Sequence, residues 1–285
     1  MTTDTYQLQE LLDWRKMMDD RLRADDGWLT VAGLHWLKDG ENSVGSAPMN
    51  GVVLPADSTP AHLGVIDYAD GAVMLTITTD EPVFVEDNAV AVNIAIPLRT
   101  DTHDDGPTVV RSRDVSFFII DREGQLAVRV KDKNNPPRLT FEGRQWYAPD
   151  PSYRVIGKFA PHSNKRTTLV ETTVGMTSEM ETPGYVDFTL HGTQIRLEAF
   201  EGGKDKDGNP NFWFVFRDAT SGKTTYPACR FMYSQLYEDG TVLLDFNRCY
   251  SPPCAFTAYA TCPMPPRQNN LQIAIEAGER DNTTH

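Results

Sequence analysis

The sequence predicts a mainly β protein that begins with a single helix. Two observations carry this prediction: apolar and polar residues alternate with period two in most segments after Gly27, and the short apolar runs are separated by Gly, Asn and Pro. Regularly spaced short strands are typical of β-sandwiches and β-barrels rather than of strand–helix–strand units. We therefore expect strand to exceed helix at least twofold.

Residues 4–25 are predicted to form the helix, which Gly27 ends. Apolar side chains recur along it at helical spacing: Leu8, Leu11, Leu12, Met18 and Leu22. This single apolar face indicates a helix that packs on the outside of a sheet.

The period-two segments that follow predict individual strands and two hairpins. Single strands are expected at residues 27–37, 71–79, 88–98, 211–217 and 241–246. One hairpin is predicted over residues 115–130, with its turn at residues 122–124, and the other over residues 186–199, with its turn at His191–Gly192.

The polar, acidic loop at residues 99–107 is the best candidate for a domain boundary. It divides the chain into a helix at 1–26, a small β module at 27–106 and a larger β module at 107–285. We expect the larger module to be an antiparallel sandwich or barrel. Five prolines between residues 252 and 266 exclude a β ladder there, so this segment is predicted to run as a stiff, irregular loop that closes the larger module.

The small module begins with GENSVGS, NGVVLP, TPAH and GAVML between Gly40 and Leu75. This layout resembles the start of a forkhead-associated domain, a β-sandwich that binds phosphothreonine peptides. The matching residues are Gly45, Asn50, Leu54, Thr59 and His62. Ser46 stands where the phosphate-binding arginine is usual, and a phosphate needs a charge-assisted donor at that point. The resemblance therefore implies a forkhead-associated-like sandwich, whereas for Thr59 and His62 we favour a role in capping a turn.

Composition restricts the partners and the compartment. The chain of 285 residues carries a formal charge of −13 and has a pI near 4.9, which disfavours nucleic acid and anionic membrane surfaces as partners. No apolar run approaches the roughly 20 residues of a membrane span, and the first ten residues lack the features of a signal peptide. We expect a soluble cytoplasmic protein with no nucleic-acid or membrane partner; the oligomeric state stays open.

The four cysteines, Cys229, Cys249, Cys254 and Cys262, are predicted to be free thiols, since a disulfide framework is typical of much shorter secreted chains. Their spacing lacks the C-x2-C pairs of structural zinc, and no two of the six histidines are three to five residues apart. We therefore predict no metal and no cofactor. The GxSxG, phosphate-loop, GxGxxG and HExxH motifs are also absent from the sequence.

The most distinctive motif lies near the C-terminus, where residues 245–256 read DFNRCYSPPCAF and residues 259–266 read YATCPMPP. Together with FRDATSG at 216–222, AGE at 277–279 and GWLTVAGLHWLKDGEN at 27–42, it resembles the uncharacterised prokaryotic family labelled domain of unknown function (DUF) 1684. That family carries no established activity, so the resemblance implies lineage and not function. Cys249 departs from the family pattern, in which a small residue such as alanine is usual, so no role is implied for it.

The candidate site residues come from this C-terminal motif and the strands before it. The end of a strand that feeds a stiff loop is a common place for reactive side chains. Asp245 and Cys254 are the catalytic candidates. Arg217, Arg230, Asn247 and Arg248 are the candidates for binding a ligand, with the arginines on an anionic group. The alternatives remain that Asp245 and Arg248 brace a turn and that Cys254 is a small buried hydrophobe.

Two functions stay open, and whether the chain is an enzyme is undecided. The first is a small-molecule binding protein or enzyme whose pocket is bordered by the C-terminal loop. The second is a non-catalytic interaction or scaffold module that uses the forkhead-associated-like sandwich. In the first case, Asn247→Ala is expected to abolish ligand binding with only a modest loss of stability.

Overall fold

The computed structural model describes residues 8–56, 59–204, 208, 210–281 and 283. Strands account for 46% and helices for 14%, which confirms the predicted mainly β class. The chain divides into two compact units. One is Leu22–Phe141, and the other joins the N-terminal residues up to Arg21 to the chain from Glu142 onward. Among the described residues, no helix has the length and apolar composition needed to cross a membrane.

The predicted N-terminal helix is α1, Leu8–Arg23, and positions 4–7 of the prediction lie outside the described residues. Leu11 and Arg15 are buried on it, whereas Leu8 and Leu12 are exposed. Trp14 packs edge-on against two aromatic rings, with centroid distances of 5.7 Å to Trp146 and 6.3 Å to Tyr250. The helix therefore packs on irregular segments of its own unit, through a face that includes a charged residue.

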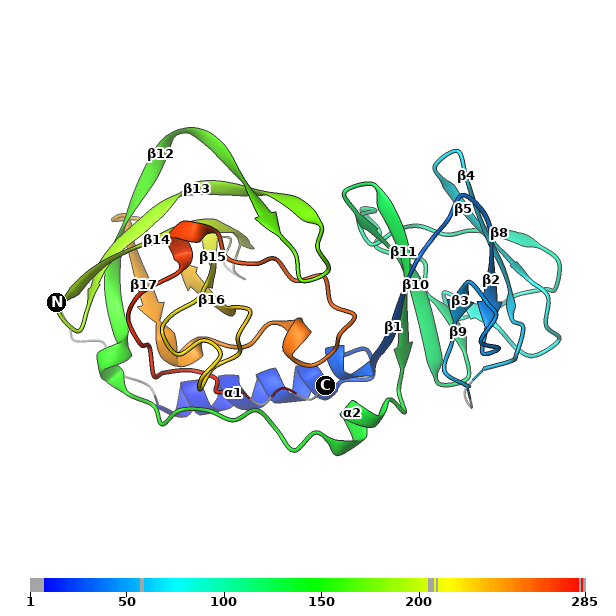
Figure 1. Cartoon of the computed structure of the whole chain (residues 1–285), viewed down its shortest axis with the longest axis horizontal. Helices are drawn as coiled ribbons and strands as arrows, with labels where there is room; N and C mark the ends of the chain where they lie inside the picture. The colour runs from blue at the N-terminus through cyan, green and yellow to red at the C-terminus, as the bar shows by residue number, and fades with distance from the viewer. Residues whose placement is uncertain (1–7, 57–58, 205–207, 209, 282, 284–285) are drawn as a thin grey trace. The chain divides into compact units, whose positions relative to one another are not determined.

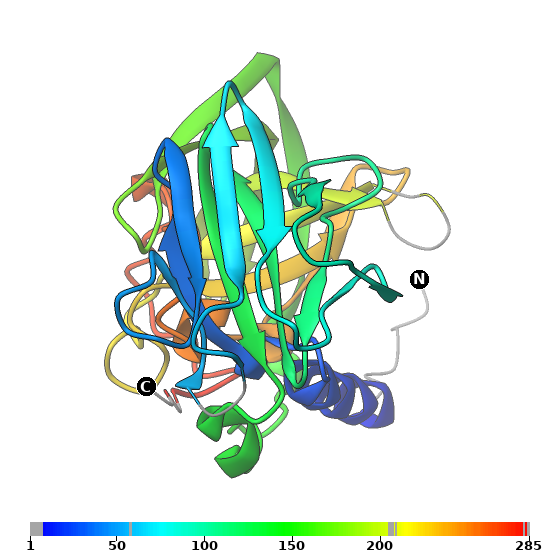
Figure 2. The ribbon, with the colours of Figure 1, turned by 90° about the vertical axis from the view of Figure 1, so that its right-hand side faces the viewer.

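The unit Leu22–Phe141 contains two sheets that share one core. The first has the strand order β1-β11-β10-β9-β6-β7 and the second β3-β2-β4-β5-β8. The strands are β1 (Val31–Trp36), β2 (Gly40–Gly45), β3 (Val52–Val53), β4 (Gly64–Ala69), β5 (Ala72–Ile77), β6 (Phe84–Val85), β7 (Asn88–Ala89), β8 (Ala95–Pro97), β9 (Val110–Ser112), β10 (Val115–Arg122) and β11 (Gln125–Asp132). A 3-10 turn at Trp28–Thr30 and the short helix α2 (Pro136–Thr140) flank them. In Figure 2, β4 and β5 run side by side as an antiparallel pair.

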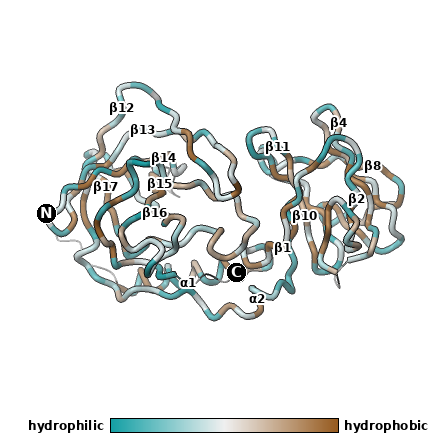
Figure 3. Tube along the Cα trace, viewed as in Figure 1, coloured by the Kyte–Doolittle hydropathy of each residue, from teal (hydrophilic) through white to brown (hydrophobic). Residues whose placement is uncertain are grey.

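Apolar side chains from both sheets fill the space between them, which confirms the predicted sandwich. Ile66 and Leu75 contribute from the second sheet, and Phe117 and Val128 from the first; all four are fully buried. In Figure 3 hydrophobic segments occur along β10 and β11, which form the predicted hairpin. The predicted strand at 88–98 is wrong as a single strand, because β7 and β8 pair in different sheets.

The boundary predicted between residues 106 and 107 falls inside this unit. The strands β10 and β11, which follow the loop, pair with β9 and β1 in one sheet, and β1 precedes the loop. The chain leaves the unit after Phe141. The limits of the compact units are thus set by strand pairing between segments that are distant in sequence. The composition of the loop does not reveal this pairing.

The second unit contains a nearly closed antiparallel barrel, visible in Figure 1. Its strand order is β16-β15-β14-β13-β12-β17. The strands are β12 (Arg154–Glu171), β13 (Thr177–Leu190), β14 (Thr193–Lys204), β15 (Pro210–Phe216), β16 (Arg230–Gln235) and β17 (Thr241–Asp245). The edge strands β16 and β17 also meet, through the bridge between Leu236 and Val242. The predicted hairpin over 186–199 is the β13–β14 pair.

Aromatic and aliphatic side chains fill the barrel, and the C-terminal segment closes one end of it. Phe214 and Phe216 from β15 pack with Phe246, and Ile275 and Ala277 join this core from the C-terminal segment. Residues 251–270, all of them described, contain no strand and only the 3-10 turns Pro253–Ala255 and Arg267–Asn269. The prediction of an irregular closing segment is confirmed.

Candidate functional site

Asp245 and Asn247, two of the predicted site residues, brace the turn after β17. The Asp245 carboxylate accepts hydrogen bonds from the backbone N–H of Asn247 at 3.1 Å and from its side-chain amide at 3.0 Å. The Asn247 amide also donates to the carbonyl of Asp150 at 2.9 Å, and its oxygen accepts from the N–H of Asp150 at 3.0 Å. Asn247 is fully buried. Its side chain therefore joins two backbone segments and leaves no polar group for a ligand.

This geometry changes the expected effect of Asn247→Ala. The substitution leaves two backbone groups of Asp150 without their partner, and an unsatisfied group costs roughly 1–3 kcal/mol. We expect urea denaturation to show a loss of that size. The exposed Asn164 of β12 offers a control, because Asn164→Ala is expected to leave the unfolding midpoint unchanged. A stable Asn247→Ala protein would instead favour the ligand-binding interpretation.

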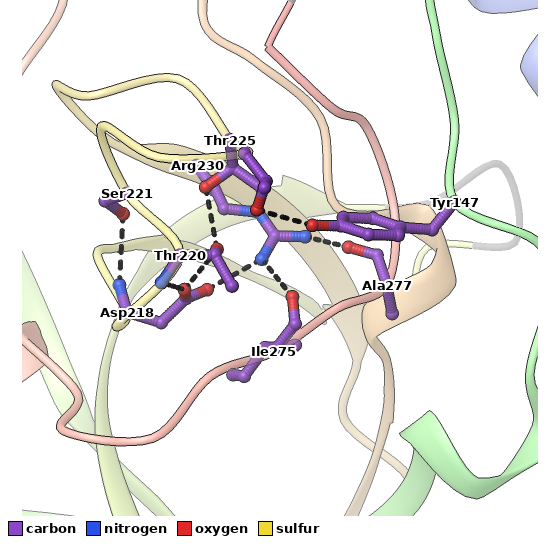
Figure 4. A network of polar contacts seen from close by, with 9 residues as sticks. Tyr147, Asp218, Thr220, Ser221, Thr225, Arg230, Ile275 and Ala277 are labelled. Atoms are coloured by element: carbon purple, nitrogen blue, oxygen red, sulfur yellow. Dashed lines mark hydrogen bonds and ion pairs between the residues drawn. The ribbon is translucent and has the colours of Figure 1, made fainter.

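Arg230 lies at the centre of a buried polar network at the closed end of the barrel (Figure 4). Its guanidinium donates to the Asp218 carboxylate at 2.7 Å and to the Ile275 carbonyl at 2.9 Å, and it also donates to the Ala277 carbonyl. The side chains of Arg230 and Asp218 are 1% and 0% exposed. The Arg230 guanidinium, which was predicted to bind an anionic ligand, is thus neutralised by Asp218 inside the fold. Its bonds to the Ile275 and Ala277 carbonyls hold the C-terminal segment in place.

Asp218 is itself held by hydroxyl and amide donors. Its second carboxylate oxygen accepts from the Thr220 N–H at 2.7 Å and from the Thr220 hydroxyl. The Thr220 and Thr225 hydroxyls are 2.8 Å apart, and Tyr147 donates to the hydroxyl of Thr224 at 2.5 Å. These bonds extend the network from Arg230 into the loop between β15 and β16.

Arg248 is also paired within its own unit. It forms ion pairs with Glu10 at 2.5 Å and with Asp245 at 3.7 Å, and its guanidinium lies 5.7 Å from the centre of the Trp14 ring. Arg248 therefore ties α1 to the turn after β17.

Arg217 behaves differently from the other two arginines. Its backbone pairs with the C-terminal segment, with its N–H donating to Asn269 and its carbonyl accepting from Leu271. Its half-buried side chain forms no hydrogen bond or ion pair within the described part of the chain. The guanidinium does act on the Cys229 thiol through its charge. Arg217 is thus a predicted ligand-binding residue that keeps an available cation.

The side chains of three cysteines and one tyrosine lie close together near Arg217. The thiols of Cys254 and Cys262 lie close enough for each to shift the pKa of the other, and the Tyr226 hydroxyl lies beside the Cys254 thiol and donates to the Cys254 carbonyl at 2.8 Å. Cys229 lies beside them, with its sulfur 3.7 Å from the Pro263 carbonyl. We call Cys229, Cys254, Cys262 and Tyr226 the thiol cluster.

Within the thiol cluster, the cysteines differ in electrostatics and access. The contact with the Cys262 thiol, followed by that with Tyr226, holds the pKa of Cys254 below the ordinary thiol value, although burial opposes the shift. The pKa of Cys262 is raised mainly by the same contact between the two thiols, and that of Cys229 by burial. Cys254 and Cys262 each retain 5% exposure, whereas Cys229 has none. The cluster therefore contains one thiol of lowered pKa, a second thiol next to it, and a phenol that donates to the backbone of the first.

The fourth cysteine, Cys249, lies in the barrel core. Burial raises its pKa to about 12, so it stays a neutral thiol at physiological pH. All four cysteines are free. Among the described residues, no group of three or more His, Cys, Asp or Glu side chains has a geometry that could hold a metal ion.

Several buried polar residues around the cluster were not predicted. Asn269, fully buried, connects the Glu198 and Val215 backbones. Glu279 accepts from the Arg144 side chain and from the Ser251 N–H, and burial raises its pKa. His162 contacts Glu198 at 2.5 Å. The partners in these pairs are at least 28 residues apart in sequence, so local patterns give no signal for them.

The residues that resemble a forkhead-associated domain support two loops. The Asn50 amide donates to the carbonyls of Ala47 and Ala61 at 3.0 and 2.9 Å, and the Ser46 hydroxyl donates to the Thr59 carbonyl at 3.0 Å. Gly45 is required by close packing, because a Cβ there would lie 2.3 Å from the Ala61 carbonyl oxygen. Ser46 therefore supplies a loop contact, and as a neutral residue it offers no charged donor for phosphate.

Comparison with known proteins gives one family and several solved structures, including the following two. The model of the family described as a protein of unknown function (DUF1684) matches residues 139–280. An uncharacterized protein of Haloarcula marismortui, solved by solution NMR, is 33% identical; the match covers 52% of this chain and 81% of that chain, with a TM-score of 0.41. A domain from an analysis of phosphothreonine-dependent FHA domain interactions is 15% identical over 34% of this chain and 92% of that chain, with a TM-score of 0.23. No curated protein matches.

Proposed function

The chain belongs to the DUF1684 family of proteins of unknown function, so an activity has to be argued from its own residues, and we propose a peroxide-reactive thiol pair made of Cys254 and Cys262. The observation that carries this proposal is the proximity of the two thiols, which shift each other's pKa in opposite directions while each keeps a small exposed surface. A peroxide is small enough for thiols that keep only 5% exposure. An acidified thiol with a second thiol beside it is the usual arrangement of a redox-sensing cysteine.

The chemistry takes two steps, each of which is balanced. The Cys254 thiolate attacks the terminal oxygen of a hydroperoxide, ROOH, and the O–O bond breaks, so that with one proton the products are a Cys254 sulfenic acid and ROH. The Cys262 thiol then attacks the Cys254 sulfur, which forms the disulfide and releases water. Tyr226 supports the first step because its contact with Cys254 lowers the pKa of that thiol, while its hydroxyl holds the Cys254 backbone by donating to the Cys254 carbonyl.

Arg217 is proposed to bind the anionic part of a charged peroxide. A guanidinium without an internal partner can donate to an oxyanion, and this one lies next to Cys229. Of the ligand-binding residues predicted from sequence, Arg217 is retained in this role, since Arg230, Asn247 and Arg248 have partners within the fold. We further propose a cytoplasmic location, where four free thiols would stay reduced.

Peptide mapping after oxidation tests the thiol pair. Reduced protein is exposed to hydrogen peroxide, its remaining thiols are alkylated, and the peptides are identified by mass spectrometry. We expect a Cys254–Cys262 disulfide, with Cys229 and Cys249 still alkylated after denaturation. Cys262→Ser should trap a Cys254 sulfenic acid that reacts with dimedone, whereas Cys254→Ser should give neither product. Alkylation of Cys254 should also show a pH midpoint below the ordinary thiol value of about 8.5.

The matched control is Cys249→Ala, which removes a core thiol and should leave the disulfide yield unchanged. Arg217→Met should slow oxidation by the anionic peroxymonosulfate about tenfold, or roughly 1.4 kcal/mol, and leave the rate with neutral hydrogen peroxide unaltered. Equal oxidation of all four cysteines, or of none, would rule out the thiol pair. If Arg217→Met slows oxidation equally with both oxidants, Arg217 does not bind the anionic peroxide, whereas the proposal of a Cys254–Cys262 thiol pair still stands.

A further inference from the structure

The end of the barrel that contains the β16–β17 turn carries a hollow of about 710 Å³. It is lined by Phe159, Pro210 and the six residues Gln235–Gly240, which connect β16 to β17. Arg154 pairs with Asp245 near the end closed by the C-terminal segment, and Lys158 pairs with Thr241 near the hollow. The hollow therefore lies at the opposite end of the barrel from Arg230 and is separate from the thiol cluster.

The inner wall of this hollow is apolar and aromatic. Phe159 and Leu236 are half-buried and pack against the barrel core, with the rings of Phe159 and Phe212 4.6 Å apart. Tyr237 is 42% exposed, so part of its ring is available to a ligand. The volume falls within the range of about 300–1,000 Å³ that is typical of small-molecule sites, and barrel mouths are a common location for them.

The rim of the hollow is acidic. Asp239 accepts from the Thr241 N–H at 2.9 Å and from the Thr241 hydroxyl at 2.6 Å, and its pKa is lowered first by these bonds and also by the charge of Lys158. Glu238 forms no hydrogen bond or ion pair within the described residues. One carboxylate is thus occupied by the turn, and the other, on the residue that follows Tyr237 in the lining of the hollow, is available.

We propose that this hollow binds a small organic ammonium ion that carries an apolar body. The body would lie against Phe159 and Leu236, and the cation would lie between the Tyr237 ring and the Glu238 carboxylate. An aromatic face attracts a cation within about 6 Å of the ring centre, and a neighbouring carboxylate adds a charge-assisted hydrogen bond. A neutral alcohol of the same shape can still donate to the carboxylate but gains neither the attraction to the aromatic face nor the ion pair, and an anionic ligand is repelled.

A ligand-observed NMR titration of the full-length protein tests this proposal with three probes of similar shape: phenethylammonium, 2-phenylethanol and 3-phenylpropionate. We expect phenethylammonium to bind at least tenfold more tightly than the other two. Glu238→Gln and Tyr237→Ala should each weaken its binding by about tenfold, and Asp187→Asn, at an exposed carboxylate on β13, should leave it unchanged.

The other results are equally informative. Equal affinity for the three probes, no saturable binding of phenethylammonium, or an unchanged affinity in Glu238→Gln would each overturn the ammonium site. Cys254→Ser, which removes the proposed redox thiol, should bind phenethylammonium as the parent protein does. A loss of binding in that variant would contradict the independence of the two sites.

Discussion

Replacing Asp218 with alanine is expected to destabilise the protein by roughly 3–5 kcal/mol, because it leaves the buried Arg230 guanidinium without its counter-ion. The pair is shielded from bulk water, since the side chains of Arg230 and Asp218 are 1% and 0% exposed. The Thr220 N–H loses an acceptor as well. The measurement is the free energy of unfolding from urea denaturation at pH 7.

Two comparisons make this prediction specific. Glu10→Gln breaks the exposed ion pair with Arg248 and should cost less than about 1 kcal/mol. The double variant Asp218→Ala/Arg230→Met removes both buried charges, so its cost should be clearly smaller than the sum for the single variants. A cost below about 1 kcal/mol for Asp218→Ala, or strictly additive costs, would show that the pair does not act as a unit.

The strands that the sequence predicted are those in which alternation and turn chemistry agree. The β10–β11 hairpin turns at Glu123 and Gly124 with φ of 55° and 81°, and the β13–β14 hairpin turns at His191 and Gly192 with φ of 48° and 81°. Two consecutive positive φ values are typical of the two-residue turns that join antiparallel strands. Glycine at the second position made both turns recognisable.

The strands that were missed have little apolar alternation. The 18-residue β12 contains exposed polar residues around position 164, where the long hairpin with β13 offers no core to pack against. In β2, the buried Asn42 satisfies its amide with the carbonyls of Lys38 and Gly40 at 2.8 and 2.9 Å. In the sequence, a polar residue at such a position suggests a loop, because the hydrogen bonds that it makes within the fold cannot be recognised there.

The candidate site was only partly predictable, for a related reason. The C-terminal motif gave Cys254 as a catalytic candidate but not Cys262, which lies eight residues further on and close to the Cys254 thiol. The motif could not show which arginine is available for a ligand. Asp218 is 12 residues from Arg230, and Glu10 is 238 residues from Arg248, so the pairing of these charges depends on the whole fold.

Asn269→Ala is expected to cost about 3 kcal/mol or more, because three buried backbone groups lose their partner and each unsatisfied group costs roughly 1–3 kcal/mol. The Asn269 oxygen accepts from the Glu198 N–H at 2.8 Å, and its amide donates to the carbonyls of Glu198 and Val215 at 3.0 and 2.9 Å. The ladder between β14 and β15 runs from Lys204–Pro210 to Phe200–Trp213. Asn269 thus bonds both strands just beyond the end of their own ladder.

The neighbouring residue supplies the control. Asn270 is exposed, and its amide donates only to the carbonyl of Arg267 at 3.2 Å, so Asn270→Ala should change the free energy of unfolding by less than about 0.5 kcal/mol. Amide hydrogen exchange adds a local readout, since the Glu198 N–H should exchange much faster in Asn269→Ala than in Asn270→Ala. If both variants unfold at the same urea concentration and protect Glu198 equally, then the side chain of Asn269 does not hold the two strands together, and the barrel wall is stable at this point without it.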